Sequence, residues 1–352
     1  MRLIVHRLLP SVSLRLAGLA VVLLALSATA GAQAPGAFAR FGMGARAAVF
    51  GPQAADVFGD ASPYHNPALA PYSASQSLEA SAALLEFDRE WQAVQVTAPL
   101  RPRAGLAGGI VRGAVTSIDG RDGSGYATGD FSTNEIAFFV AFGTRFSEKV
   151  SGGIGLRIYR SDLFEAIRPT TAIGVGAGLA VRATDRLALG LVAEDLFAKY
   201  NWNASAAGGG TVSDDFPIRI RGGSAYRMGP ETGAGKLVVA AEVEGQIRST
   251  ETRQPGGIST GGGFPTPETV TTDLRVGDVL ARFGAEYHVV DPLAVRVGAD
   301  RILLGDTGEI RPSAGFSVRP SLGELSLRID YAATLEPFGT AIAQTATLRV
   351  EL

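Results

Sequence analysis

The sequence predicts an all-β fold: a transmembrane, antiparallel, up-and-down β-barrel of about fourteen strands with an N-terminal plug. Three observations lead to this prediction. Apolar residues alternate with polar residues or glycine, short and long connections alternate between these segments, and the chain begins like an exported protein. With 352 residues, a net charge of −2 and no cysteine, the chain has no disulfide framework and lacks the basic footprint of a nucleic-acid-binding protein.

Residues 1–32 are expected to form a secretory signal peptide. Arginines precede an apolar run at 16–26, and Ala30-Gly31-Ala32 satisfies the A-x-A cleavage rule. The alternative is a single membrane anchor, but the run is only about 11 residues long, and a spanning helix needs about 20. We therefore expect cleavage, with Gln33 as the first residue of the mature chain.

Residues 75–352 contain the alternating segments that predict the barrel. In 171–183, for example, Ile173 and Val175 fall on one face, and Gly174 and Arg182 fall on the other. Successive side chains of a β-strand point to opposite faces, so this period of two indicates strands. The predicted strands are 75–86, 90–100, 104–117, 131–146, 150–161, 171–183, 186–195, 216–228, 236–248, 274–289, 293–302, 311–319, 324–335 and 341–352.

The connections between these segments decide the architecture, because short and long ones alternate. Tight turns at one end and long loops at the other are typical of an outer-membrane barrel, and an even strand count fits as well. We therefore expect a location in the outer membrane, in contact with its lipid, with the short turns and both termini on the periplasmic side. The short connections are 101–104, 147–149, 184–186, 228–235, 291–292 and 320–323, and the long ones include 119–131, 161–170, 196–215 and 249–273.

One face of the predicted strands is apolar, whereas the other carries charges of both signs. A lysine or arginine that faces lipid at the midplane costs about 2–4 kcal/mol, so the charged face is expected to line the lumen. A soluble sandwich with its charged face outward is the alternative, but it has fewer strands than this chain predicts. The expected lumen residues are Arg157, Arg182, Glu194, Arg219, Arg221, Glu242, Glu244, Arg282, Glu286, Arg296, Asp300, Arg328, Asp330, Arg349 and Glu351.

Residues 33–74 precede the first strand and are small, apolar and interrupted by glycine and proline. Glycines on the lumen face, as in the segment GVGAG, leave room inside the barrel for such a segment, although they also permit a strand to bend. We therefore expect 33–74 to form a plug. The Asn66-Pro67 turn marks where the chain leaves the lumen for the first strand.

The sequence predicts neither an enzyme nor a cofactor or metal site. Only His65 and His288 follow the leader, which makes a metal cluster or histidine-based catalysis hard to build. The residues 196–202, LFAKYNW, are the one loop segment with the apolar character expected at the entrance of a channel for hydrophobic molecules.

The segment 39–71 resembles the N-terminal signature of FadL-like fourteen-stranded outer-membrane barrels, and more closely that of the PorV/PorQ branch. Met43-Gly44, Ala54-Ala55-Asp56, Asp60-Ala61-Ser62 and Asn66-Pro67-Ala68 match the signature. Leu69 stands where glycine is usual, and Tyr64-His65 precedes the asparagine where a tryptophan is common. The candidate plug residues are Met43, Gly44, Asp60, Asn66, Pro67 and Ala68.

This resemblance implies two functions that the sequence leaves open. A PorV/PorQ-like protein would serve type IX secretion without enzymatic activity, with secreted proteins and other secretion components as partners. A FadL-like protein would instead conduct hydrophobic small molecules past a plug in its lumen. The long polar loop at 249–273 favours the first function, which is the expectation here, with the channel as its alternative.

Overall fold

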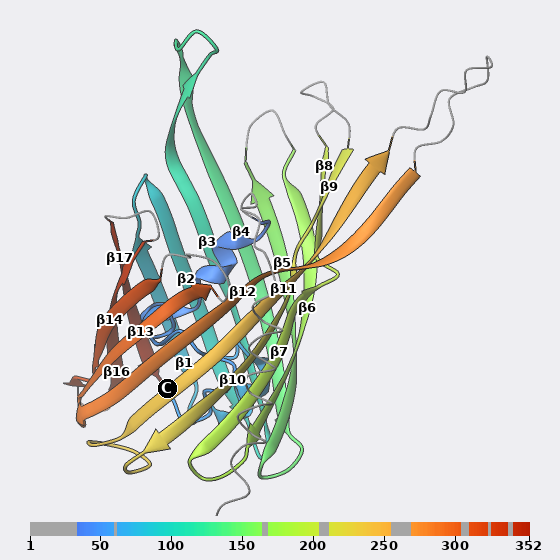
Figure 1. The fold of residues 1–352 in the computed structure, drawn as a ribbon. Helices are drawn as coiled ribbons and strands as arrows, with labels where there is room; N and C mark the ends of the chain where they lie inside the picture. Colours follow the sequence, from blue (N-terminus) through green and yellow to red (C-terminus); the bar gives the residue numbers. More distant parts are fainter. Residues whose placement is uncertain are drawn as a thin grey trace, which may run out of the picture.

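Fourteen strands of the described residues close into an antiparallel barrel (Figure 1). The structure is a computed structural model that describes residues 34–59, 62–163, 168–203, 211–254, 269–303, 310–322, 325–336 and 341–352. Consecutive barrel strands are neighbours in the sheet, and the ring closes where β1 pairs with β17. The predicted fold class is therefore confirmed, whereas the predicted signal peptide, 1–32, lies outside the described residues.

Every predicted strand corresponds to one strand of the barrel, and most ends agree closely. A two-residue strand, β15 (Ser321–Leu322), adds to one of the turns. The barrel strands are β1 (Ser77–Leu84), β2 (Arg89–Leu100), β3 (Ala104–Arg121), β4 (Ala127–Arg145), β5 (Val150–Asp162), β6 (Thr170–Arg182), β7 (Leu187–Leu196), β10 (Ile218–Met228), β11 (Leu237–Gln254), β12 (Thr269–Val290), β13 (Leu293–Leu303), β14 (Arg311–Val318), β16 (Leu325–Leu335) and β17 (Ile342–Glu351).

The alternation in the sequence separates the two faces of the barrel wall. Along β1, residues are buried and exposed in strict turn, with Glu79 inside and Leu78 outside. Apolar side chains such as Phe138 and Ile154 stand exposed on the outer face, as a lipid-facing surface requires. Because β1 pairs with β17, the described barrel has no open edge between its first and last strands. The backbone N–H and C=O groups of these two strands then have partners, as the interior of a membrane requires. Among the described residues, no helix is long and apolar enough to cross a membrane.

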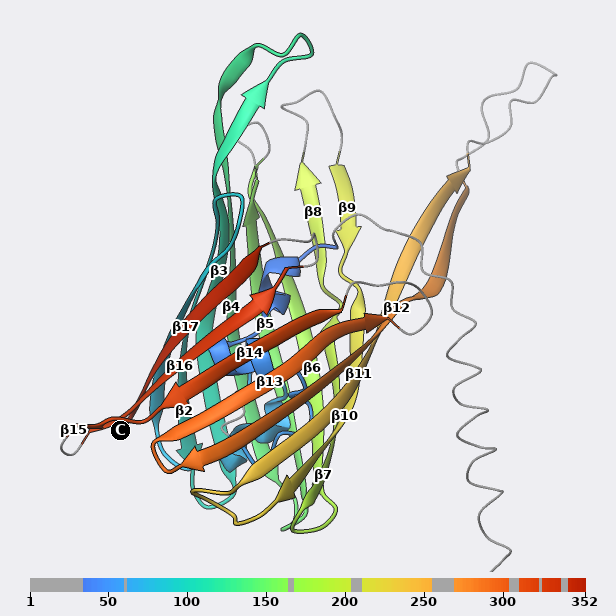
Figure 2. The same ribbon diagram turned by 60° about the vertical axis from the view of Figure 1, so that its left-hand side comes forward.

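Two of the predicted long loops are partly strands, so the boundaries predicted there are wrong. Asp119 pairs with Asp130 and Gly120 with Gly129, inside the loop predicted at 119–131. Figure 2 shows this β3–β4 hairpin rising well beyond its neighbours. β11 and β12 likewise extend into the loop predicted at 249–273. These extensions lie beyond the part of the barrel wall whose outer face is apolar, so neither of their faces has to be apolar. Their backbones can therefore pair as strands without a period of two in the sequence.

A further hairpin lies within the predicted loop 196–215 and was not expected from the sequence. β8 (Lys199–Asn203) pairs with β9 (Thr211–Asp215), and both stand apart from the barrel sheet at its long-loop end (Figure 2). β8 packs against the neighbouring β6. Five residues are too few to show a clear period of two, which explains why the sequence pattern missed these strands.

The segment before β1 lies inside the ring of strands and touches opposite walls (Figure 1). It contains a 3₁₀ helix η1 (Ala37–Phe41), an α-helix α2 (Gly44–Phe50) and a second 3₁₀ helix η2 (Pro67–Tyr72). α2 packs against β12–β14, β16, β17 and β1, and η2 packs against β2–β6. We call residues 34–59 and 62–74 the plug.

Inward-facing glycines of the wall allow the plug backbone to come this close. A Cβ atom on Gly143 would overlap the carbonyl oxygen of Pro67, and one on Gly284 would overlap the carbonyl oxygen of Phe50. The same overlap with a plug atom would occur at Gly105, Gly153, Gly178, Gly190 and Gly298. These glycines lie on seven different strands, so the wall and the plug fit each other around the ring.

Replacing Gly284 with alanine is therefore expected to destabilise the folded barrel by about 1–3 kcal/mol, the usual effect of overpacking. The free energy of unfolding in urea measures this effect. Gly222→Ala on β10 is the matched control, because its Cβ would meet only the Leu191 Cδ1 atom, at 3.9 Å. Equal effects of the two substitutions would contradict the close fit.

Candidate functional site

The turn at Asn66 fixes the second half of the plug. Asn66 is fully buried and caps η2, since its Oδ1 accepts a hydrogen bond from the Ala68 N–H at 2.9 Å. Its Nδ2 donates to the Ala54 carbonyl oxygen at 2.6 Å, which ties this turn to the first half of the plug. Pro67 occupies the first helical position, where a missing N–H has no cost.

The other predicted plug residues lie beside the same turn. The Met43 N–H donates to Nε2 of the buried His65 at 3.0 Å, so the start of α2 and the Asn66 turn are joined. Gly44 has a φ of +84° and faces Glu79 and Thr347 of the wall, a conformation and a spacing that favour glycine. Asp60 lies outside the described residues.

Charged residues of the wall form a first cluster with α2. Arg46 of the helix pairs with Asp56 of the plug at 2.5 Å and with Glu286 of β12 at 2.7 Å. Glu286 is bound by Arg296 at 2.6 Å, and Arg296 also reaches Asp330 at 2.8 Å. Arg328 completes this cluster by pairing with Asp330 at 2.8 Å.

A second cluster runs along the inner wall from β5 through β7 to β10–β13. Glu194 accepts from Arg157 at 2.6 Å and lies 2.9 Å from Arg221, and Arg219 pairs with both Glu194 and Asp195. The cluster continues through Glu242 to Arg282, which also pairs with Glu244 and Asp300.

The plug backbone takes part in this second cluster. Oε2 of Glu242 accepts hydrogen bonds from the N–H groups of Gln53 and Ala54, at 2.9 and 2.7 Å. The buried charges of the lumen are thus paired with each other or with plug groups, as burial requires. Arg182 lies apart from both clusters, with its guanidinium 5.5 Å from the ring centroid of Tyr72.

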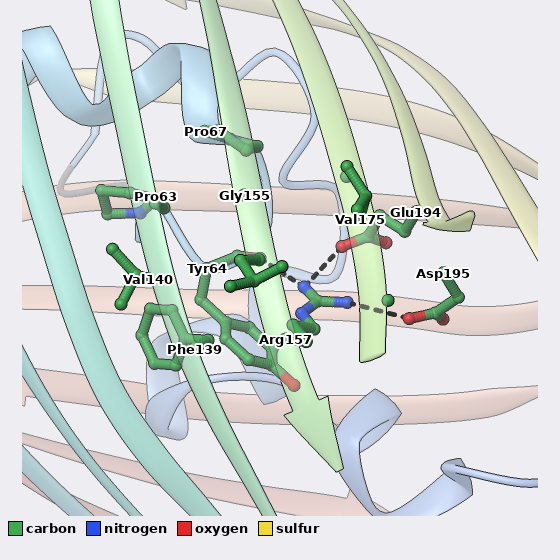
Figure 3. A pocket seen from close by; sticks show the side chains of 14 residues that line it. Pro63, Tyr64, Pro67, Phe139, Val140, Gly155, Arg157, Val175, Glu194 and Asp195 are labelled. Atoms are coloured by element: carbon green, nitrogen blue, oxygen red, sulfur yellow. Dashed lines mark hydrogen bonds and ion pairs between the residues drawn. The ribbon is translucent and has the colours of Figure 1, made fainter. Parts of the chain in front are cut away.

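Beside the second cluster, a small cavity of about 20 Å³ lies between the plug and the wall of β4–β7 (Figure 3). On the side of the plug, the cavity is lined by Pro63, Tyr64 and Pro67. Its wall side includes the ring of Phe139 and the outward-facing residues Val140, Leu156 and Val175. Arg157, Glu194 and Asp195 are its charged lining residues.

The wall is thin and irregular at this cavity. Gly155, Gly174 and Gly176 line it without side chains. Val175 of β6 pairs with Leu196 and Ala177 pairs with Ala193, so the β6–β7 register shifts at Gly176. Glu194 and Asp195 form the resulting bulge, and Asp195 has a φ of +61°. Bulges interrupt the ladder and re-aim side chains, which here brings two consecutive carboxylates to the lumen.

The structure thus brings together the predicted lumen charges except Arg182, Arg349 and Glu351, and it adds residues that the sequence did not single out. Arg349 lies 3.9 Å from Glu351 and 4.0 Å from Glu79, apart from both clusters. Arg46 was missed because it belongs to the plug and not to an alternating strand. Asp195 was missed because its position in the alternation is an outward one, and only the bulge turns it inward. Tyr64 was noted only as a departure from a family signature. No group of three or more histidines, aspartates or glutamates is arranged to hold a metal within the described ranges.

Comparison with known proteins finds the fold but no close relative. No family model matches the chain, and no curated protein matches it. The Pseudomonas putida toluene transporter TodX is 13% identical with a TM-score of 0.56, and the match covers 88% of this chain and 96% of that one. The CymD monoaromatic hydrocarbon channel is also 13% identical, with a TM-score of 0.53 and coverage of 88% and 96%.

A Pseudomonas aeruginosa FadL homologue is 12% identical, with a TM-score of 0.53, over 87% of this chain and 96% of that one. These similarities extend over most of each chain. The described residues therefore have the fold of the FadL-type fourteen-stranded outer-membrane barrels.

Arg46 is expected to stabilise the contact between the plug and the wall. Arg46→Met leaves buried carboxylates at Asp56 and Glu286 with one partner fewer, so the folded state should lose about 3–5 kcal/mol. Urea unfolding measures the loss, and limited proteolysis reports whether the plug loosens. Arg121→Met removes the exposed pair with Asp119 and serves as control, with little change expected. Similar stabilities of the two variants would contradict a structural role for the Arg46 cluster.

His65 in the plug is expected to make the stability depend on pH. Burial, followed by the charge of Arg221, holds the pKa of His65 well below its usual value. The unfolded chain takes up this proton below about pH 6.5 and the folded chain does not, so stability should fall as pH drops below about 6.5. His65→Gln keeps an acceptor for the Met43 N–H but cannot titrate. Its stability should lack this part of the pH dependence, and an unchanged pH profile would refute the assignment.

Proposed function

We propose that the chain is an outer-membrane channel that admits small, mostly hydrophobic molecules to the cavity between the plug and the β4–β7 wall. The single observation that carries this proposal is the cavity itself. It is largely apolar with a few charged groups, and its volume of about 20 Å³ has room for a water-sized molecule, so a larger hydrophobic molecule passes only when the lining side chains move. The neighbours in fold are described as a toluene transporter and a monoaromatic hydrocarbon channel, which supports the same proposal.

A stack of aromatic rings leads from the long-loop end of the barrel toward the cavity. Trp202 contacts Tyr200 with centroids 5.2 Å apart, and Tyr200 contacts Phe216 at 4.8 Å. Phe216 contacts Tyr159 at 4.7 Å, and Tyr159 lies next to Gly174 of the cavity wall. The predicted apolar loop 196–202 supplies the outer end of this stack. Tyr159, Tyr200 and Phe216 are buried against each other, so a hydrophobic molecule would reach this apolar path only when the rings move apart.

The cavity also borders the lipid-facing side of the wall. Val140, Leu156 and Val175 line the cavity and are also 36–52% exposed on the outer face. Gly155, Gly174 and Gly176 add no side chain of their own to the wall here, although Pro67 packs against Gly155 and Tyr159 against Gly174. A hydrophobic molecule in the cavity is therefore close to the lipid phase in which it dissolves readily, which is a favourable end point for transport.

The type IX secretion function remains a prediction without support from these findings. It rests on the sequence signature around Asn66, and the structure uses that signature to place the plug, which a channel needs equally. Export by a signal peptide, a location in the outer membrane and periplasmic termini belong to both proposals. We expect no catalysis in either case.

Gly176→Val tests the channel proposal directly. The first added carbon would lie 3.4 Å from the Ala193 carbonyl oxygen, so it fits, and the two methyl groups would occupy the cavity. Uptake of ethylbenzene by cells that make this variant should fall to the level of cells without the protein. Gly222→Val on the outer face is the matched control and should leave uptake unchanged. Normal uptake through a folded Gly176→Val barrel would refute the proposal.

A further inference from the structure

The short-turn end of β2–β7 carries a row of basic side chains. The three turns between these strands, together with the strand ends beside them, contain six basic residues and two acidic ones, Glu148 and Asp185. Figure 1 shows this end of the strands opposite the long β3–β4 hairpin. The six basic residues, which we call the basic row, are Arg101, Arg103, Arg145, Lys149, Arg182 and Arg186.

Backbone hydrogen bonds hold the three turns side by side. The Arg145 N–H donates to the Arg103 carbonyl oxygen at 2.8 Å, and the Arg182 N–H donates to the Lys149 carbonyl oxygen at 2.7 Å. β4 and β5 remain paired as far as Arg145 and Ser151, which closes the interval between these two bonds. Neighbouring strands lie about 4.8 Å apart, so the basic row is a continuous arc of the barrel rim.

The basic row differs from exposed arginines at the other end of the barrel, because it has no carboxylate partners. Arg121 at the long-loop end pairs with Asp119 at 2.6 Å, and Arg112 pairs with Glu90 at 3.0 Å. Within the described part of the chain, no residue of the basic row forms an ion pair. The protein itself therefore leaves the positive charge of this arc without a counter-charge.

Two members of the basic row are held against the plug. Arg145 Nη2 donates to the Pro71 carbonyl oxygen at 2.8 Å, and the guanidinium groups of Arg145 and Arg182 lie 4.8 and 5.5 Å from the ring centroid of Tyr72. These contacts fix two positive charges at the rim without neutralising them, since the tyrosine ring carries no net charge. The other four members are exposed and accessible to a ligand: Arg101, Arg103, Lys149 and Arg186.

The exposed members of the row adjoin the apolar outer surface of the barrel. Leu100 is 43% exposed and directly precedes Arg101, and Phe146 is 65% exposed and directly follows Arg145. The apolar band of a membrane barrel ends at the level of the lipid headgroups, where long basic side chains place their charges in the polar layer. The row is thus at the height where lipid phosphates lie.

A phospholipid matches both features of this arc. Its acyl chains would cover Leu100 and Phe146, while its phosphate accepts hydrogen bonds from arginine and lysine side chains. An acidic peptide or a free phosphate ion would meet the charges but leave the apolar side chains uncovered. A zwitterionic headgroup would also bring its own cation to the row, whereas an anionic headgroup would not. Clusters of four or more basic residues beside a membrane typically bind anionic lipids.

We propose that the basic row binds the headgroups of anionic phospholipids in the leaflet at the short-turn end. The site covers the β2–β7 arc and not the whole rim, because the β10–β11 and β12–β13 turns present the exposed acidic residues Glu231 and Asp291. The proposal goes beyond the channel function and does not depend on it.

Phosphatidylglycerol and phosphatidylcholine with identical acyl chains test the proposal. The full chain in a nonionic detergent is titrated with each lipid, and native mass spectrometry measures the fraction of protein with bound lipid. Phosphatidylglycerol should bind at least about fivefold more tightly, which is the usual effect of one basic residue near an anionic surface. The advantage should shrink at about 1 M salt, because salt screens exposed charges. Equal binding of the two lipids would overturn the proposal.

A triple variant assigns this preference to the basic row. Arg103→Gln/Lys149→Gln/Arg186→Gln removes one exposed charge from each of the three turns and should abolish the preference for phosphatidylglycerol. The matched control removes the same charge from exposed positions toward the long-loop end and should keep the preference: Arg121→Gln/Arg160→Gln/Arg301→Gln. A preference that survives in the first variant, or that is lost equally in both, would overturn the assignment.

Two competitors identify a lipid as the source of the phosphate. Inorganic phosphate and a decaglutamate peptide, each at the concentration of the lipid, should leave the bound phosphatidylglycerol unchanged. Displacement by phosphate would indicate a site for free anions, and displacement by the peptide would indicate an acidic protein partner. Either result would overturn the lipid assignment. The lipid comparison on the unaltered chain decides the proposal even if the triple variant fails to fold.

Discussion

The close approach between the plug backbone and the inward glycines of the wall is the constraint on which the rest of the structure depends. Carbonyl groups of Val49, Phe50, Ala54, Pro67 and Ala70 lie where a Cβ atom of the facing strand would otherwise be. The plug can therefore follow the inner wall closely around the ring. This contact holds Asn66 and Tyr64 against β4–β7, and it brings Arg46 and the N–H groups of Gln53 and Ala54 within reach of wall carboxylates.

Buried charge is the second constraint, and its arrangement follows from the first. The lumen wall carries arginines and carboxylates on neighbouring strands, so most of these charges find partners within the sheet, as Arg282 does with Glu242 and Arg296 with Glu286. Breaking one pair leaves a charge in a poorly hydrated space, which is much more costly than losing the same pair at the surface. The clusters thereby fix the plug to both β5–β10 and β12–β16. Small cavities are left beside Tyr64 and beside Arg46.

Much of the fold was predictable because a membrane requires each crossing strand to have one apolar face, and side chains alternate between the two faces with a period of two. Every strand that crosses the apolar belt must show it, and all of the barrel strands were found in this way. The extensions of β3, β4, β11 and β12 and the hairpin β8–β9 were not, because they lie where no such alternation is required. The glycines suggested space for a plug, although not which carbonyl groups would fill it. The cavity was beyond sequence reasoning, since it depends on a bulge that turns Asp195 inward and on the path of a segment without periodicity.

The plug touches strands on both sides of the junction between β17 and β1, because Thr347 of β17 accepts from the Ala45 N–H and also contacts Ser81 of β1. Ejecting the whole plug would strip this junction of its inner support and leave Glu242 and Glu286 without several of their donors. In the proposed channel, a molecule would therefore pass by rearrangement of side chains beside the plug, while the plug backbone and its Asn66 turn stay in place. The rate of passage would then be set by local side-chain motion, which is faster than the unfolding of a domain.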